Sequence, residues 1–184
     1  MQIAWRSLKW EGMEHLWLRG GADGAREADG VVVAHLHGAP LRLHYRVRCD
    51  GGYRVREVVV ELPAEAKRVE LRSDGEGRWT NPAGHALPAL DGCIDVDIAM
   101  TPFTNTLPIE RLRLSPGESR DLSVAWIDAP SLEVKPVRQR YTLLQRDGDS
   151  AKWRYQSGDF SADLDVDARG LVLSYAGFWQ RVGP

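Results

Sequence analysis

The sequence predicts an all-β fold built mainly from antiparallel strands, and two observations carry this prediction. Apolar and polar residues alternate over several stretches, most regularly over 41–49, which reads Leu-Arg-Leu-His-Tyr-Arg-Val-Arg-Cys. Successive side chains of a strand point to opposite faces of the sheet, so this pattern is typical of a half-buried strand. Turn signals such as Asp50-Gly51 and Asp147-Gly148 separate the alternating stretches, which favours a succession of hairpins.

The composition is that of an ordinary globular chain. With 184 residues, of which 43% are hydrophobic and 27% charged, we expect a single domain over 1–184. The net charge of -2 argues against a nucleic-acid binder, which usually carries a basic excess. No stretch approaches the roughly 20 apolar residues of a membrane span, and Met1–Arg6 lacks the apolar run of an export signal. We therefore expect a cytoplasmic protein, with Cys49 and Cys93 as reduced thiols in the core.

The first hairpin is expected between residues 31–37 and 41–49. A loop of Gly38-Ala39 keeps the apolar faces of the two strands in register. Glycine at the first position of a two-residue loop is the signature of a type II′ turn. The residues that face each other are then Leu36 and Leu41, Ala34 and Leu43, and Val32 and Tyr45.

A change of phase follows in the next strand. Tyr53 and Val55 are apolar at odd positions, whereas Val58 and Val60 continue at even positions. Because a shift by one residue moves side chains to the other face, we expect a β-bulge near Glu57.

The stretch 101–112 departs from strand character. Thr106 is a candidate N-cap, and Pro108 suits a first helical turn. Ile109 and Leu112 would then share one helical face at a spacing of three residues. We expect one short helix here.

Two patterns resemble metal sites, and neither predicts one. The Asp-x-Asp-x-Asp run at 163–167 lacks the glycine position and the bidentate glutamate of a calcium loop. His35, His37 and His44 share the polar face of the first hairpin, but neighbouring arginines oppose a divalent cation there. No metal and no cofactor is predicted.

A pair of carboxylates is the one catalytic candidate. Asp95 and Asp97 lie on one face of the expected strand 93–98, with Cα atoms about 6–7 Å apart. Carboxyl pairs at such spacing act as acid and base in glycoside cleavage, which makes a hydrolase one alternative. A solvent-facing strand has the same pattern, and Asp97 can instead orient the loop at 101–105.

Arginines crowd two neighbouring strands, where like charges would destabilise the sheet unless they are neutralised. Those expected to face each other are Arg42, Arg46 and Arg48 on one strand and Arg54 and Arg56 on the next. The residues expected to neutralise them on a third strand are Glu61, Glu65 or Glu70. Otherwise, these arginines would form a cationic surface for a phosphate or carboxylate group.

Seven tryptophans are many for a chain of this length. Trp79, Trp126 and Trp153 fall in or beside expected strands. An indole ring suits a core, and equally a greasy pocket with a hydrated mouth. The sequence has no Gly-x-Ser-x-Gly elbow, phosphate loop or dinucleotide fingerprint, so no enzyme class is indicated.

Four segments together resemble a known family. The stretch 90–112 contains the string Thr-Pro-Phe-Thr-Asn-Thr-Leu-Pro-Ile, and 74–79 runs from Asp-Gly to Trp. Gln139-x-Tyr141 and the segment 155–175 extend the match toward the C-terminus. These residues resemble the bacterial "putative glycolipid-binding" family, formerly a family of unknown function. The resemblance covers most of the chain.

The resemblance implies a spiral β-roll, in which a long antiparallel sheet wraps around a single helix and which often forms a homodimer. It also implies an amphipathic ligand, similar to a lipid or glycolipid, bound in a groove lined by aromatic side chains. The expected ligand-binding residues are Trp79, Asp95, Asp97, Thr104, Asn105, Arg111, Trp126 and Tyr141. We expect binding without catalysis. The alternatives are a structural or dimerisation module without ligand, and the hydrolase that uses Asp95 and Asp97.

Overall fold

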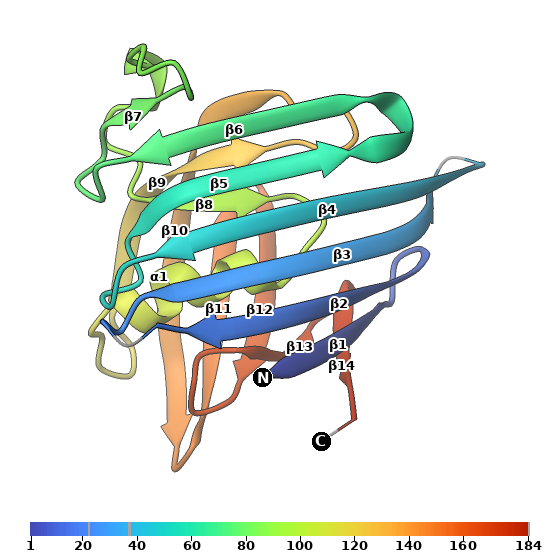
Figure 1. The fold of residues 1–184 in the computed structure, drawn as a ribbon. Coiled ribbons are helices and arrows are strands. Elements are labelled where there is room, and N and C mark those ends of the chain that lie inside the picture. Colours follow the sequence, from blue (N-terminus) through green and yellow to red (C-terminus); the bar gives the residue numbers. More distant parts are fainter. Residues whose placement is uncertain (22, 37, 184) are drawn as a thin grey trace.

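In the computed structural model, which describes residues 1–21, 23–36 and 38–183, one long curved sheet dominates the fold. Within these residues, 14 strands follow in the order β7-β6-β5-β4-β3-β2-β1-β14-β13-β12-β11-β10-β9-β8, and the sheet does not close (Figure 1). Neighbouring strands are antiparallel except β8 and β9, which are parallel. The described chain also holds one short α-helix, α1. The all-β, mainly antiparallel fold is therefore confirmed.

The strands are β1 (Gln2–Ser7), β2 (Glu11–Gly20), β3 (Arg26–Leu36), β4 (Ala39–Cys49), β5 (Val55–Leu62), β6 (Lys67–Ser73), β7 (Trp79–Thr80), β8 (Asp95–Ile98), β9 (Ser119–Ile127), β10 (Val134–Asp147), β11 (Ser150–Ser157), β12 (Phe160–Val166), β13 (Val172–Tyr175) and β14 (Trp179–Val182). The helical elements are α1 (Thr106–Arg111) and three 3-10 turns, η1 (Pro63–Glu65), η2 (Pro88–Leu90) and η3 (Phe103–Asn105). Within the described residues, none of these helical elements has the length and apolar character needed to cross a bilayer.

The first hairpin forms with the expected faces but in another register. β3 and β4 pair Ala34 with Leu41 and Val32 with Leu43, so the expected pairing of Leu36 with Leu41 is wrong by two residues. A shift of two residues leaves every side chain on its own face, and alternation alone therefore cannot distinguish these registers. Gly38 lies in the turn with a positive φ of 83°; the expected strand end at His37 lies outside the described residues.

The expected β-bulge is present. Arg48 pairs with Glu57 and Cys49 pairs with Val55, which leaves Arg56 as the extra residue on β5. Both cysteines are free and buried, as expected.

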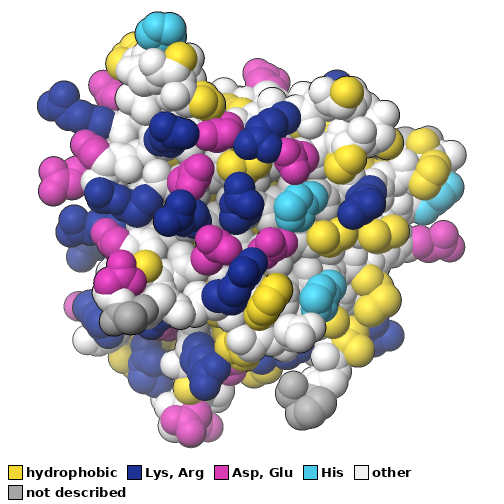
Figure 2. Space-filling model, viewed as in Figure 1, with side chains coloured by type: hydrophobic (Ala, Val, Ile, Leu, Met, Phe, Trp, Pro, Cys, Tyr) yellow, Lys and Arg dark blue, Asp and Glu magenta, His cyan; other side chains and the backbone are white. Residues whose placement is uncertain are grey.

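The bulge also corrects the expected row of facing arginines. Arg46 lies opposite Val59 and Arg48 lies opposite Glu57, so neither faces Arg54 or Arg56. The outer face of these strands shows basic and acidic side chains interspersed (Figure 2). Glu61 and Glu70 neutralise arginines as predicted, through ion pairs with Arg68 and, for Glu70, also with Arg72. Glu65 is instead in η1 and exposed.

The segment from Thr101 to Arg111 fills the space enclosed by the curved sheet, and we call it the plug. In Figure 1, α1 lies behind β3 and β4 and in front of the strands of the C-terminal half. Phe103 stacks on Tyr45 of β4, with ring centroids 6.3 Å apart. Leu107 is fully buried in the same cluster, whereas Ile109 packs with the residues of β10 to β13. The plug therefore joins the two parts of the core.

The plug does not begin as the sequence predicted. Thr106 is the first residue of α1, makes no capping bond, and has a buried hydroxyl without a partner among the described residues. The chain instead enters through η3, where the Phe103 backbone N–H donates to the Thr101 hydroxyl over 3.0 Å. A preceding 3-10 turn supplies carbonyls for the first N–H groups of α1, so no cap is needed.

Candidate ligand-binding groove

A hollow of about 460 Å³ lies beside the plug, and we call it the aromatic groove. Six aromatic side chains contribute to its lining: Trp126, Tyr155, Phe160, Tyr175, Phe178 and Trp179. They come from β9, β11, β12, β13, β14 and the turn before β14. Sheet curvature brings together side chains from five strands and a turn, and this is what makes the wall concave.

The aromatic rings form a continuous chain of contacts. Tyr155 lies 5.9 Å from Phe160 and 6.2 Å from Tyr175 between ring centroids, and Phe178 lies 5.2 Å from Phe160 and 5.1 Å from Tyr175. These distances are typical of favourable edge-to-face and tilted ring pairs. Phe160 is nonetheless 37% exposed, a high value for such a large apolar side chain. The groove therefore presents apolar surface to solvent.

Two lysines lie over the aromatic rings at the groove. Lys9 Nζ is 4.5 Å from the centroid of the Phe178 ring, and Lys135 Nζ is 4.9 Å from that of Trp126. Both lysines are exposed, so these cation–π contacts leave the ammonium groups open to an anionic group on a ligand.

The floor of the groove is polar and centred on Asp97. Its carboxylate accepts from Thr104 Oγ1 at 3.1 Å and from Gln139 Nε2 at 2.6 Å. Gln139 also donates to the Tyr155 hydroxyl at 3.0 Å. Burial raises the pKa of Asp97, and the bonds from Gln139 and Thr104 oppose that rise. A neutral amide therefore holds this carboxyl, with no cation bonded to it.

Asn105 contributes a second polar group to the floor. Its side-chain oxygen accepts from the hydroxyl of Tyr141 at 2.9 Å, and its amide nitrogen donates to the Pro102 carbonyl at 3.3 Å. Tyr141 is 2% exposed, and burial raises its pKa well above the ordinary value. Tyr141 thus fixes the orientation of Asn105 from behind.

Thr101 connects the floor to a buried acid. Its hydroxyl donates to Glu14 Oε1 over 2.8 Å, and the Tyr45 hydroxyl donates to the same oxygen. Glu14 is fully buried, and burial raises its pKa to about 8. The Tyr45 ring takes the place that a side chain at Gly30 would need, because a Cβ there would collide with the ring. Glycine at this position lets Tyr45 reach Glu14.

The predicted ligand-binding residues separate into three groups. Asp97, Asn105 and Trp126 line the aromatic groove. Thr104 and Tyr141 lie one hydrogen bond behind it. The remaining three, namely Trp79, Asp95 and Arg111, lie elsewhere.

Trp79 is a core residue, since it is 1% exposed and donates from its indole to the Cys93 carbonyl at 2.6 Å. Asp95 is completely buried and forms an ion pair with Arg111. Burial raises the pKa of Asp95, and Arg111 opposes that rise. Asp95 therefore does not join Asp97 in the groove, and the two carboxylates do not share one pocket.

The sequence reasoning missed several groove residues: Lys9, Gln139, Tyr155, Phe160, Tyr175, Phe178 and Trp179. Parity was an available signal for Gln139, a polar residue two positions before the buried Tyr141 on the same face of β10. Phe178 lies in a turn, where alternation gives no information.

The metal patterns find other partners in the structure. Asp163 pairs with Arg154 and Asp165 with Lys152 across β11 and β12. His44 contacts Asp29 and Glu61, while His37 lies outside the described residues. Over the described part of the chain, no group of three or more histidine, cysteine or acidic residues has metal-site geometry.

Comparisons with known proteins add a family and a solved structure. A family model described as "Putative glycolipid-binding" matches residues 2–181. The crystal structure of a DUF1089 family protein from Pseudomonas aeruginosa is similar, with 39% sequence identity and a TM-score of 0.80, and the match covers 92% of each chain. No curated protein matches the chain.

Proposed function

The chain belongs to the family described as "Putative glycolipid-binding", and from this premise we propose that it binds an amphipathic, lipid- or glycolipid-like molecule in the aromatic groove without transforming it. The observation that carries the proposal is the groove itself, in which six aromatic side chains surround a floor of Asp97, Thr101 and Asn105. A module that only packs the roll shut has no need of such a hollow beside the plug.

The apolar part of the ligand would lie against the aromatic rings. A volume of about 460 Å³ falls within the roughly 300–1,000 Å³ of small-molecule sites. Burial of about ten methylenes, at ~0.8 kcal/mol each, would be offset in part by association costs. We therefore expect micromolar affinity for a single-chain amphiphile.

The polar part of the ligand would meet the floor. The carboxylate of Asp97 accepts hydrogen bonds, while the Asn105 amide and the Thr101 hydroxyl both donate and accept. Sugar hydroxyls need such mixed partners, and the CH faces of a sugar ring pack against aromatic rings. The groove thus fits a glycosyl head group next to an alkyl chain.

The test is a titration of delipidated protein with dodecyl maltoside, followed by tryptophan fluorescence. We expect a saturable signal, because Trp126 and Trp179 line the groove. Phe160→Ser should raise the Kd about tenfold, since one anchoring aromatic ring is lost. Trp17→Ala removes an aromatic ring that is 46% exposed on the outer face and serves as the control.

The outcomes separate the proposal from its rivals. Absence of saturable binding to folded, delipidated protein would overturn it and favour the structural or dimerisation module. Cleavage of the glycoside, abolished by Asp97→Asn with the fold intact, would replace binding by the hydrolase. Native mass spectrometry of gently purified protein would identify any amphiphile that copurifies.

A further inference from the structure

A second hollow, of about 1090 Å³, lies where β9 becomes an edge strand. β8 pairs with β9 only from Val124 onward, so residues 119–123 have β10 on one side and no strand on the other among the described residues. The C-terminal end of α1 and the chain that follows it border the same hollow. We call it the cationic groove.

Five arginines line the cationic groove, against one lining carboxylate, that of Asp121. They are Arg111, Arg113, Arg120, Arg138 and Arg140. Asp121 accepts two bonds from Arg140, at 2.6 and 2.7 Å, and Arg111 is paired with the buried Asp95. Among the residues that the structure describes, Arg113, Arg120 and Arg138 have no carboxylate within 4.0 Å. This positive excess stands against a chain whose net charge is -2.

Another hollow on the same molecule provides the contrast. At the end of the sheet where β2, β3, β4 and β5 meet their turns, a hollow of about 880 Å³ has five arginines and four carboxylates in its lining. There the charges neutralise each other, as in the pairs Arg19–Glu27 and Arg48–Glu57. Arginine content alone therefore does not distinguish the cationic groove, whereas its lack of neutralising carboxylates does.

We propose that the cationic groove binds a phosphate or sulfate group, with Arg120 and Arg138 as its principal partners and Arg113 as a third. A guanidinium presents several N–H donors in one plane and bonds such oxyanions in a bidentate way. Positive charges gathered in a hollow also attract anions over a distance of several ångströms.

The cationic groove adjoins the aromatic groove. Gln139 lines the cationic groove and bonds Asp97, which lines the aromatic groove. The oxyanion can therefore be the head group of an amphiphile or a free phosphate. The anion site itself does not depend on the function proposed above.

The experiment compares three compounds by isothermal titration calorimetry: dodecyl phosphate, dodecyl maltoside and inorganic phosphate. The variant is Arg120→Gln with Arg138→Gln, and the matched control is Arg48→Gln with Arg72→Gln, which removes the same charge from the balanced hollow. We expect the Kd for dodecyl phosphate to rise at least about tenfold in the variant, the loss expected for charge-assisted hydrogen bonds. The control should keep its affinity, and dodecyl maltoside should bind all three proteins alike.

The source of the anion follows from the inorganic phosphate. If inorganic phosphate binds saturably and loses affinity in the variant, the site takes free phosphate; if only dodecyl phosphate does so, it takes a lipid head group. Failure of dodecyl maltoside to bind would count against the aromatic groove alone.

Other outcomes would overturn the anion site. Equal weakening in the control would reduce the effect to overall charge. Unchanged phosphate affinity, with new self-association of the variant, would mean that the arginines only protect the free edge of β9. Binding of a single-stranded oligonucleotide but of neither phosphate compound would assign the groove to a different partner.

Discussion

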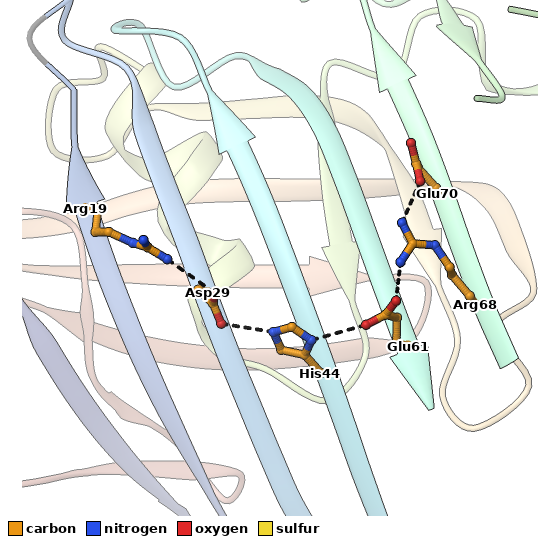
Figure 3. A network of polar contacts seen from close by, with 6 residues as sticks. All are labelled: Arg19, Asp29, His44, Glu61, Arg68 and Glu70. Atoms are coloured by element: carbon orange, nitrogen blue, oxygen red, sulfur yellow. Dashed lines mark hydrogen bonds and ion pairs between the residues drawn. The ribbon is translucent and has the colours of Figure 1, made fainter. Parts of the chain in front are cut away.

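Two polar networks of this molecule contain the same residue types and behave in opposite ways. The outer network runs across four strands (Figure 3) and consists of Arg19, Asp29, His44, Glu61, Arg68 and Glu70. In it, the bond from His44 lowers the pKa of Glu61, and the bond from Arg68 lowers that of Glu70. The inner network joins Glu14 to Tyr45 and Thr101, and there burial raises the pKa of Glu14.

Access to solvent explains the difference. The linking side chains of the outer network are 15–48% exposed, so water solvates their charges and partners add a modest stabilisation. Glu14 has no contact with water, and its second carboxyl oxygen has no partner among the described residues. A carboxyl group thus stays ionised on the outer face and keeps its proton near the groove.

The largest expected effect tests a buried ion pair. Arg111→Ala leaves Asp95 buried without its cation, and we expect a loss of about 3–5 kcal/mol in the free energy of unfolding. Loss of Arg111 raises the pKa of Asp95 further, so the folded state keeps a proton that the unfolded state releases. Stability then falls as pH rises, and urea titration should find a larger deficit near pH 8 than near pH 5. Asp95→Leu with Arg111→Met, which removes both charges, should restore most of the loss.

The next effect concerns packing rather than charge. Leu107 in the plug is fully buried, and Leu107→Ala should cost about 2–5 kcal/mol through lost burial and a residual cavity. Leu8→Ala, at a position that is 49% exposed, is the control. A loss below about 1 kcal/mol in urea titration would mean that the plug contributes little to the core.

A third prediction uses pH to test the inner network. The pKa of Glu14 rises from 4.5 to about 8 on folding, so its stabilising effect is complete below 4.5 and disappears as pH rises toward 8. Across this range the wild type should lose at most about 1.4 kcal/mol per pH unit. Glu14→Gln lacks the titrating group, and its unfolding free energy should fall less steeply with pH. Parallel curves for the two proteins would contradict the raised pKa.

The smallest effect is expected on the outer face. His44→Gln breaks the link between Asp29 and Glu61, yet it should cost less than about 1 kcal/mol, because exposed pairs contribute little. Added salt should reduce the difference further. A cost as large as that of Arg111→Ala would remove the distinction between the two networks.

The same distinction governs what could be predicted from sequence. The faces of β4 follow from strict alternation, and the bulge beside Glu57 follows from a change of phase. The register of the first hairpin does not, because a shift of two residues preserves both faces. The plug was located by its proline and threonine content, but its 3-10 entry depends on contacts with the sheet.

The groove was predictable only in part. Asp97, Asn105 and Trp126 belong to it, whereas Trp79 and Asp95 share residue type and parity with true candidates and are core residues instead. Which inward side chains border a hollow depends on how far the sheet curves, and no local pattern encodes that. Glu14 did leave a local signal, since it shares the parity of the buried Leu16 and Leu18.

The close approach of Gly30 and Tyr45 has a consequence for how this protein can change. A larger residue at position 30 displaces the Tyr45 ring, and displacement of Tyr45 removes one of the two hydrogen bonds to Glu14. Positions 14, 30, 45 and 101 therefore form a mutational unit, in which single changes are penalised and compensated pairs are tolerated. Among related sequences these four positions should covary, and a library that varies them together should recover combinations that stepwise selection cannot reach.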